Sequence, residues 1–465
     1  MAGTQTNATR STLVLDIGKT NVKLMVMSKI GSILDESRMD NVSIDAPPYL
    51  HLDPDRIWQW LLDRAAEFAR GYDIDAIITT THGCAGVLVD GAGPILPPMD
   101  YEANVPDDVA KAFEVVQPPF SQSQCPSLPQ GQNLGRQLFW QQHAFPDQFA
   151  QTQWVLAYPQ YWAWRLSGVA ASEITSMGCH SHLWEPGNRR FSTLVEQMGW
   201  RELFPPMKAA FDALGTIMPH IAQRTGLSPD CRVYNGIHDS NSAYSLYLHG
   251  HERAFSLVST GTWVIMFSPR MDLAQLNQDR DTLANVNLLG EPLPTARFMG
   301  GREFEILTGD LDTREFSVRD VRAVIDKRSF LSPSFTLGGP FSGRQGKTVG
   351  PELTEPGEIL ARATIYLALV TRTSMKILQS DGDLLIDGGF VNNTMYCRLL
   401  AKLSGHERCY ANHATEGTAV GAGMLTVWND DSSAAPLELT PVEPFEDPGL
   451  DAYAAQWERL AQAPA

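Results

Sequence analysis

Asp16-Ile-Gly-Lys-Thr-Asn-Val-Lys23 decides the fold, because it is a glycine-containing turn between two strand-like runs. Residues 12–16 lead into this turn and residues 22–27 leave it; both runs are rich in Val and Leu, and the second also contains two Met. A third run, 32–37, follows after Gly31. Short strands separated by glycine turns predict an antiparallel meander at the front of an α/β domain.

The turn itself has the composition of an anion site. Gly18 lets backbone N–H groups approach an anion closely, and Thr20 adds a hydroxyl donor. Lys19 supplies positive charge, and Asp16 at the strand end can hold Mg²⁺ directly or through water. An ordinary tight hairpin is the alternative interpretation of this stretch taken alone.

The second half of the chain repeats this pattern imperfectly. Ser259-Thr-Gly-Thr262 also lies between two strand-like runs, and Thr80-Thr-His-Gly83 and Ile386-Asp-Gly-Gly389 each follow a strand. We therefore predict two similar α/β domains, an N-terminal one over 1–245 and a C-terminal one over 246–465. Between and after these motifs we expect a helix near 54–70, a helical and loop-rich region over 101–230, a turn into a helix over 235–249, a long apolar helix over 358–380, and a C-terminal helix with Tyr453, Trp457 and Leu460 at helical spacing.

Composition narrows the class of protein. A chain of 465 residues is too long for a single hydrophobic core. Its content of 43% hydrophobic and 19% charged residues is typical of a soluble globular protein. The net charge of -17 argues against nucleic acid or an anionic membrane as the main partner. The six cysteines are scattered, the first residues are polar, and no apolar run reaches the ~20 residues of a membrane span. We therefore expect a cytoplasmic enzyme.

Gly236-Ile-His-Asp239 opens a predicted helix and supplies a candidate base. Phosphoryl transfer needs a carboxylate near the acceptor hydroxyl, to orient it and take its proton. Capping of the helix is the alternative role for Asp239. Gly343-Arg-Gln-Gly-Lys-Thr348 resembles a Walker loop, but residue 341 is Phe where the first glycine should stand, and Pro351 interrupts the helix that should follow.

Two turns in the second half suit a nucleotide. Thr260, Gly261 and Thr262 offer hydroxyls and backbone donors to a phosphoryl group, although such turns are usually only turns. Gly388 and Gly389 lie where a strand meets a helix, so the backbone there can approach a nucleotide's phosphates. Ordinary strand–helix glycines are the alternative.

Six motifs in chain order together resemble the FGGY family of carbohydrate kinases, from about Leu13 to Leu460. They are Asp16-x-Gly-x-Thr20, Thr81-His82-Gly83, Gly236-x-His-Asp239, Ser259-Thr-Gly-Thr-Trp263, Asp387-Gly-Gly389 and Thr418-Ala-Val-Gly-Ala-Gly423. The resemblance implies an α/β, actin-like ATPase fold (ribonuclease H-like) whose two similar domains close around a central cleft. It also implies ATP-dependent phosphorylation of a sugar, with the sugar on the N-terminal domain and the nucleotide on the C-terminal one.

The resemblance also implies roles for single residues. Asp239 would be the base, and Asp16 would help to bind Mg²⁺. His82, Asp100, Tyr101 and His238 would fall in the sugar pocket, Lys19 and Thr20 would line the phosphate path, Thr260, Gly261 and Thr262 would meet the γ-phosphate, and Gly388, Gly389 and Asn392 would hold the adenosine side. A structural role for His82 and a packing role for Tyr101 stay open as alternatives.

Departures from the family pattern bear on the substrate. Thr81-His82-Gly83-Cys84 stands where glycerol kinases carry an Arg-Glu pair, which argues against glycerol. Gly-Ile-His-Asp239 resembles rhamnulokinases and fuculokinases more than xylulokinases, so we expect a deoxyketohexose whose methyl group rests on Cys84 or Ala85. Core packing is the alternative role for these two residues, and xylulose, ribulose and an erythritol-like polyol stay open. Ala401-Lys402 departs from the family's adenosine motif.

Other classes of function remain alternatives. One is a non-catalytic actin-like nucleotide-binding scaffold or regulator, which would need no base. Another is a glucokinase-like enzyme of the repressor group, which usually carries a cysteine-rich zinc motif that this chain lacks. A homodimer is left open, and the glutamine-rich residues 121–142 have no assigned role.

Overall fold

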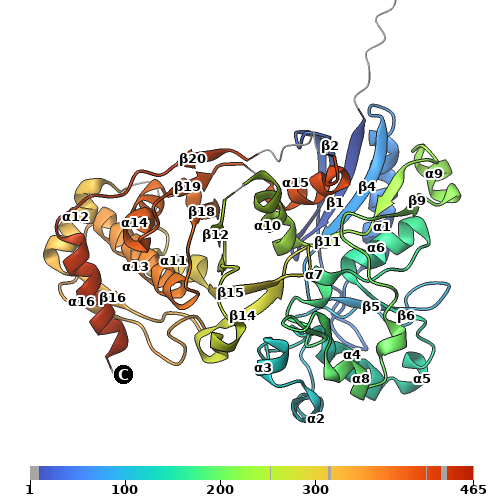
Figure 1. Ribbon diagram of the computed structural model, residues 1–465, viewed down its shortest axis with the longest axis horizontal. Helices are drawn as coiled ribbons and strands as arrows, with labels where there is room; N and C mark the ends of the chain where they lie inside the picture. Colours follow the sequence, from blue (N-terminus) through green and yellow to red (C-terminus); the bar gives the residue numbers. More distant parts are fainter. Residues whose placement is uncertain (1–9, 252, 313–315, 415, 431–436, 464–465) are drawn as a thin grey trace, which may run out of the picture. The chain divides into compact units, whose positions relative to one another are not determined.

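The computed structural model forms two compact units (Figure 1). It describes residues 10–251, 253–312, 316–414, 416–430 and 437–463. Of these, residues 10–251, 285–292 and 416–430 make up unit 1, and the others make up unit 2. The chain first passes from one unit to the other after residue 251, and segments 285–292 and 416–430 return to unit 1. A single boundary at 245/246 therefore describes the division incompletely.

Unit 1 is built on a mixed sheet in the order β3-β2-β1-β4-β10-β9, with β11 also pairing with β4. β1 pairs antiparallel with β2 and β2 antiparallel with β3, which confirms the predicted meander. On its other side β1 pairs parallel with β4, and β4 in turn pairs parallel with β10 and β11. The strands are β1 (Ser11–Ile17), β2 (Asn21–Ser28), β3 (Ile33–Asp40), β4 (Ile74–Thr81), β9 (Ala213–Thr216), β10 (Arg232–Tyr234) and β11 (Ile237–His238).

Helices cover both faces of this sheet. The strand β1 carries apolar side chains on both faces, and these have to be buried. Leu13, Leu15 and Ile17 pack in one hydrophobic cluster with α1 and α6, whereas Val14 contacts Gly423 of α15 on the other face. The predicted helix near 54–70 is α1, which Asp53 caps by accepting from the Arg56 N–H. The helices around the sheet are α1 (Pro54–Phe68), α6 (Tyr158–Ser167), α9 (Pro219–Thr225), α10 (Asp239–Gly250), α15 (Gly417–Met424) and η5 (Leu425–Val427).

The region between β4 and β9 forms a second hydrophobic cluster around Phe113, Leu138 and Trp200. The glutamine-rich segment contributes Leu134 and Leu138 to this cluster, and the amide of Gln137 has a structural role. Gln137 donates to the carbonyl oxygens of Cys84 and Gly131, both at 2.6 Å. The elements are β5 (Gly86–Val89), α2 (Asp107–Val116), α3 (Phe120–Ser123), α4 (Leu134–Ala144), α5 (Pro146–Phe149), β6 (Trp154–Ala157), α7 (Ile174–Met177), β7 (Trp184–Glu185), β8 (Arg190–Phe191), α8 (Thr193–Gln197) and η1 (Arg201–Leu203).

Unit 2 repeats the sheet topology of unit 1. Its sheet runs β14-β15-β13-β12-β18-β19-β20, with β12 antiparallel to β13 and parallel to β18, as β1 is to β2 and β4. The internal repeat predicted from the two Gly/Thr turns is therefore confirmed. The strands are β12 (Phe255–Thr260), β13 (Val264–Phe267), β14 (Thr282–Val286), β15 (Pro292–Phe298), β18 (Asp383–Gly388), β19 (Cys409–Asn412) and β20 (Leu439–Pro441).

The long buried helix α13 organises the helical layer of unit 2 and packs against α11, α12 and α14 (Figure 1). The C-terminal helix α16 packs back as predicted, because Trp457 Nε1 donates to Leu331 O at 2.7 Å and Tyr453 donates to Ser329 O at 2.6 Å. The stretch 343–348 leads into a strand of the β16–β17 hairpin, which confirms that it is no Walker loop. The elements are η2 (Leu273–Gln275), η3 (Gln278–Arg280), α11 (Gly300–Thr308), α12 (Val318–Lys327), β16 (Phe330–Ser332), β17 (Lys347–Val349), α13 (Pro356–Ile377), η4 (Gly389–Asn392), α14 (Thr394–Ser404) and α16 (Leu450–Gln462).

Candidate active site

The predicted site residues divide between the two units. Asp16, Lys19, Thr20, His82, Asp100, Tyr101, His238 and Asp239 lie in unit 1, and Thr260, Gly261, Thr262, Gly388, Gly389 and Asn392 lie in unit 2. In unit 1 the carboxyl ends of three parallel strands meet, since Thr81 of β4 pairs with Ile17 of β1 and with His238 of β11. Ligands of α/β sheets bind at such ends.

Asp16 is a buried carboxyl group, and in the described part of the chain it has no hydrogen bond or ion pair. Its side chain is 9% exposed. Burial and then the charge of Asp239 raise the pKa of Asp16 to about 7, against the lowering effect of Lys23. Lys23 itself is committed to an ion pair with Glu416. Two carboxylates that repel each other in this way are a fitting place for a cation.

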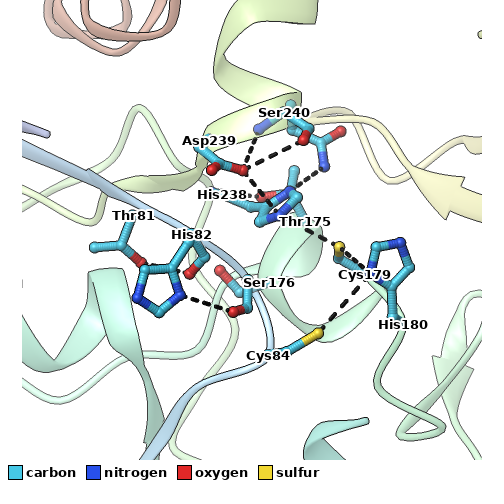
Figure 2. A network of polar contacts seen from close by, with 12 residues as sticks. Thr81, His82, Cys84, Thr175, Ser176, Cys179, His180, His238, Asp239 and Ser240 are labelled. Carbon is cyan, nitrogen blue, oxygen red and sulfur yellow. Dashed lines mark hydrogen bonds and ion pairs between the residues drawn. The ribbon is translucent and has the colours of Figure 1, made fainter. Parts of the chain in front are cut away.

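Asp239 is the first residue of α10, and its two carboxylate oxygens have different surroundings (Figure 2). Oδ1 accepts from the Ser240 N–H at 2.6 Å and from the Ser240 hydroxyl at 3.3 Å. His238 Nε2 lies 3.1 Å from the same oxygen. The side chain remains 32% exposed, so the carboxylate is both held and accessible.

His238 is buried, and both ring nitrogens have neighbours. Nδ1 lies 3.2 Å from the amide nitrogen of Asn241, and Nε2 lies 3.3 Å from Cys179 Sγ as well as near Asp239. The backbone N–H of His238 donates to the hydroxyl of Thr175 at 3.2 Å. Burial lowers the pKa of His238, so the ring is neutral near pH 7. Its predicted contact with a sugar stays a prediction.

His82 follows the last residue of β4 and is buried against aromatic rings. Its Nδ1 donates to Gly83 O at 3.0 Å, and its Nε2 has no hydrogen-bond partner in the described part of the chain. The ring packs edge-on against Tyr101 at 5.4 Å and against Tyr158 at 5.6 Å. Burial lowers the pKa of His82, which makes Nε2 of the neutral ring an acceptor.

Asp100 and Lys19 are bound to each other. Asp100 is fully buried, and its carboxylate accepts from Lys19 Nζ, from the Ser43 hydroxyl and from the Glu102 N–H. Burial raises the pKa of Asp100, but these donors together hold it below its ordinary value. Lys19 Nζ also lies 3.1 Å from Glu102 and 5.0 Å from the Tyr101 ring centroid. Their predicted contacts with sugar and phosphate stay predictions, as does that of the exposed Thr20.

A thiol–imidazole group completes this side and was missed from the sequence (Figure 2). His180 Nδ1 lies 3.4 Å from Cys179 Sγ and 3.8 Å from Cys84 Sγ. The segment is anchored by the fully buried Glu173, which caps α7 by accepting from the N–H and hydroxyl groups of Thr175 and Ser176. Burial raises the pKa of Glu173 to about 7 in spite of these four donors. Nothing in the local sequence marks this group, because Cys84 joins it only in three dimensions.

In unit 2, the hydroxyl of Thr260 locks β12 to the segment after β18. It donates to Asp387 O at 2.6 Å and accepts from the Phe390 N–H at 3.0 Å. Gly388 has a φ of 86°, and a Cβ there would collide with Thr260 O. Thr260 is therefore committed to the fold, and its predicted contact with a γ-phosphate stays a prediction.

The turn beyond Thr260 is open. Gly261 and Thr262 are exposed, as are Gly388, Gly389 and Asn392. Gly301 of α11 lies directly against Gly261 O, so the N-terminus of this helix meets the turn. A helix N-terminus and exposed backbone N–H groups are suited to phosphate. This contact was not predicted from the sequence, in which the pair Gly300-Gly301 is its signal.

In the described ranges, no three His, Cys, Asp or Glu side chains are grouped so that they could hold a metal ion. Magnesium bound with a nucleotide usually takes only one or two carboxylates and completes its ligands with phosphates and water. In the same ranges, no helix has the length and apolar character of a membrane span.

Comparison with family models gives a match over most of the chain. Residues 11–244 match the N-terminal domain of the FGGY family of carbohydrate kinases, and residues 252–435 match the C-terminal domain of carbohydrate kinase FGGY.

Solved structures show the same fold. A carbohydrate kinase from Novosphingobium aromaticivorans is 34% identical with a TM-score of 0.90, covering 98% of this chain and 99% of that one. A xylulose kinase from Rhodospirillum rubrum, 17% identical, superimposes with a TM-score of 0.76 over 97% of both chains. The predicted two-domain, actin-like ATPase fold is confirmed.

Among curated proteins, the chain matches L-fuculokinases. It is 28% identical to that of Salmonella typhi over 286 residues, which is 57% of this chain and 58% of that protein. It is 27% identical to that of Escherichia coli K12 over the same shares. The match thus spans little more than half the length of these relatives.

Proposed function

The chain belongs to the FGGY family of carbohydrate kinases, and from that premise we propose that it transfers the γ-phosphoryl group of ATP to a hydroxyl of a small ketose. One observation carries the proposal. Two carboxyl groups, Asp16 at the end of β1 and Asp239 at the start of α10, are held close enough for the charge of one to raise the pKa of the other. A magnesium triphosphate would relieve this repulsion, and an acceptor alcohol would use the base.

Asp239 is the proposed general base. Its partly exposed carboxylate has one oxygen engaged by Ser240 and His238, and it can orient an alcohol and take its proton. A nucleotide-binding scaffold would have no use for such a group, which favours an enzyme over that alternative.

Asp16 is the proposed protein ligand of Mg²⁺, directly or through water. It is buried, and Lys23, whose charge lowers its pKa, forms an ion pair with Glu416 instead. When bound, the ion would neutralise the charge that develops on the phosphates. Lys19 and Thr20 stand on the same turn and are proposed to line the phosphate path.

The proposed nucleotide site is on unit 2. Gly261 and Thr262 would offer backbone and hydroxyl donors to the phosphates, with α11 beginning beside them. Gly388, Gly389 and Asn392 are exposed where β18 leads into α14, and are proposed to hold the adenosine side. Thr260 would act by fixing the turn through its bonds to both strands.

The proposed sugar site is on unit 1, against His82, Tyr101, Asp100 and His238. The Nε2 of His82, which has no hydrogen-bond partner among the described residues, would accept a hydrogen bond from a sugar hydroxyl. The similarity to L-fuculokinases favours a 6-deoxyketohexose such as fuculose, with rhamnulose and pentuloses as further candidates. Cys84 is half-buried and Ala85 is buried, so Cys84 is the better contact for a terminal methyl group. Such a contact contributes only ~1 kcal/mol of discrimination.

A substrate panel tests the proposal. Ketoses and polyols, including fuculose, rhamnulose, xylulose, ribulose, erythritol and glycerol, are incubated with ATP and Mg²⁺ and scored by coupled ADP release. We expect sugar-dependent ADP release that is greatest with a deoxyketohexose. Its absence with every sugar would refute the kinase, and a preference for a pentulose would correct only the substrate.

A further inference from the structure

The two oxygens of the Asp239 carboxylate are not equivalent (Figure 2). Three contacts converge on Oδ1, namely the Ser240 N–H at 2.6 Å, the Ser240 hydroxyl at 3.3 Å and His238 Nε2 at 3.1 Å. No hydrogen bond or ion pair to Oδ2 is found among the described residues. An oxygen that already accepts several hydrogen bonds is a weaker proton acceptor than its neighbour.

Two independent contacts define the protonation of His238. The amide nitrogen of Asn241, which only donates, lies 3.2 Å from Nδ1, so Nδ1 must be the acceptor. Nε2 faces the Asp239 carboxylate, which only accepts, so Nε2 must carry the proton. A neutral ring meets both requirements in one tautomer, with its proton on Nε2.

The surroundings keep this ring in place. Gly83 lies so close that a Cβ there would be 2.7 Å from His238 Nε2. Thr175 accepts from the backbone N–H of His238, and Glu173 holds Thr175 in turn. The ring is thus held at its backbone N–H and at Nδ1, with Gly83 close to Nε2.

We infer that His238 is a positioning residue that, held in one tautomer by Asn241, fixes Oδ1 of Asp239 and leaves Oδ2 to take the proton of the sugar hydroxyl. The inference rests on the proposed kinase function and adds to it which oxygen is the base and what aims it. His238 then acts on the sugar through Asp239.

The sugar oxygen bonds to the γ-phosphorus while the bond from that phosphorus to the bridging oxygen breaks, and the electron pair leaves on ADP. The proton of the sugar hydroxyl passes to Oδ2 of Asp239 and is released to water after the product leaves. The bond from His238 Nε2–H to Oδ1 is kept throughout, so His238 neither gains nor loses a proton.

Two amide substitutions at position 238 separate positioning from mere packing. In His238→Gln the amide nitrogen stands near the place of Nε2 and can still reach Oδ1, whereas in His238→Asn it stands near the place of Nδ1 and cannot. We expect kcat to fall by about 10²-fold in H238N and to stay within about threefold in H238Q, with the KM for ATP unchanged in both. His220→Asn, an exposed histidine of α9, is the matched control and should leave kcat unchanged.

Wild-type turnover in H238N would overturn the inference, and so would an equal loss in H238Q and H238N at equal melting temperature. Should either variant not fold, the tautomer is read on the wild-type protein. With ¹⁵N-labelled histidine, long-range NMR correlations are expected to show a neutral ring with its proton on Nε2. A ring protonated on Nδ1, or on both nitrogens at pH 7, would refute the inference.

The outcomes distinguish this inference from the proposed function. If the kinase assignment fails, the wild-type protein releases no ADP with any sugar. If only the positioning role fails, the wild-type protein is active, Asp239→Asn is inactive, and H238N keeps full activity.

Discussion

The two units share one arrangement of strands, but their buried carboxyl groups lie on strands that are not equivalent. In unit 1, β1 and β4 pair so that Asp16 lies opposite Thr80. In unit 2, the equivalent strands β12 and β18 pair so that Ser259 lies opposite Asp387. Both carboxyl groups are buried, at 9% and 8% exposed, but only that of Asp387 accepts a hydrogen bond from the next backbone N–H, at 2.6 Å from Gly388.

The turns that follow these strands also differ in the side chains that they carry. The turn of unit 1 carries Lys19, with Lys23 just after it, whereas the turn of unit 2 carries hydroxyls and an exposed glycine. The turn of unit 1 therefore carries titratable side chains, whereas the turn of unit 2 exposes its backbone. We relate this difference to a proposed division of labour, with metal and acid–base chemistry on unit 1 and phosphate binding on unit 2.

Among the changes that compare the two units, the largest effect is expected from Asp16→Asn, which removes the buried carboxyl group at the end of β1. Activity with Mg²⁺ should fall by about 10²-fold or more. The folded pKa of about 7 is above the ordinary 3.8, so the contribution of this group to stability is present below about pH 4 and is lost as pH rises through 7. Without metal, D16N should therefore be more stable than wild type at pH 8, by about 4 kcal/mol.

Chemical denaturation at pH 4 and pH 8 checks this, with Asp230→Asn on the surface as control. A D16N protein that is less stable than wild type at pH 8 would contradict the account of an unpaired carboxylate.

Gly388→Ala tests how closely the two strands of unit 2 approach. The new Cβ would collide with Thr260 O at a φ of 86°, so we expect the free energy of unfolding to drop by about 3 kcal/mol. Gly405→Ala is the matched control, with a φ of 79° but no atom within 4 Å of the new Cβ, and should cost about 1 kcal/mol. Equal losses in the two variants would show that the close approach is unimportant.

Gly261→Val probes the open backbone of the same turn. Only Trp263 O lies near the new Cβ, at 3.8 Å, so the protein should fold normally. If the turn binds phosphate, the side chain should lower kcat/KM for ATP by about 10²-fold. Gly93→Val, also in open space, is the control, and unchanged ATP kinetics in G261V would remove this turn from the phosphate path.

Glu173→Gln should have the smallest effect, and on stability alone. Because the folded pKa of Glu173 is about 7, its contribution to stability is present below about pH 4.5 and is lost as pH rises through 7. Between pH 5 and pH 8 the wild-type protein should lose about 2 kcal/mol from this group, and E173Q should not. Melting curves across this range decide, with the exposed Glu196→Gln as control, and parallel curves for wild type and E173Q would contradict the prediction.

Local sequence patterns predicted several of the main strands and helices correctly. The meander around Gly18, helix α1, the second hairpin at Gly261 and the packing of α16 all follow from short runs with a clear period or a glycine turn. The segments 285–292 and 416–430, which return to unit 1, were not predictable, because membership in a unit is decided by contacts distant in sequence.

Of the candidate site, the sequence could predict only the residues at the ends of strands, and not the partners that they contact. Glu416 is 393 residues from the lysine that it binds, and Cys179 reaches His238 across 59 residues. Partners of this kind have no local signature. Lys19 was predicted from its turn as a phosphate contact, yet the partner that decides its charge balance is Asp100, 81 residues away.

The role of Asp239 as the base is tested by the turnover of Asp239→Asn with the best sugar of the panel, together with its affinity for ATP. We predict a loss of roughly 10²–10⁴ in kcat, because the amide cannot take the proton, with ATP affinity unchanged. Near-normal turnover in this variant would contradict the assignment of Asp239 as the base.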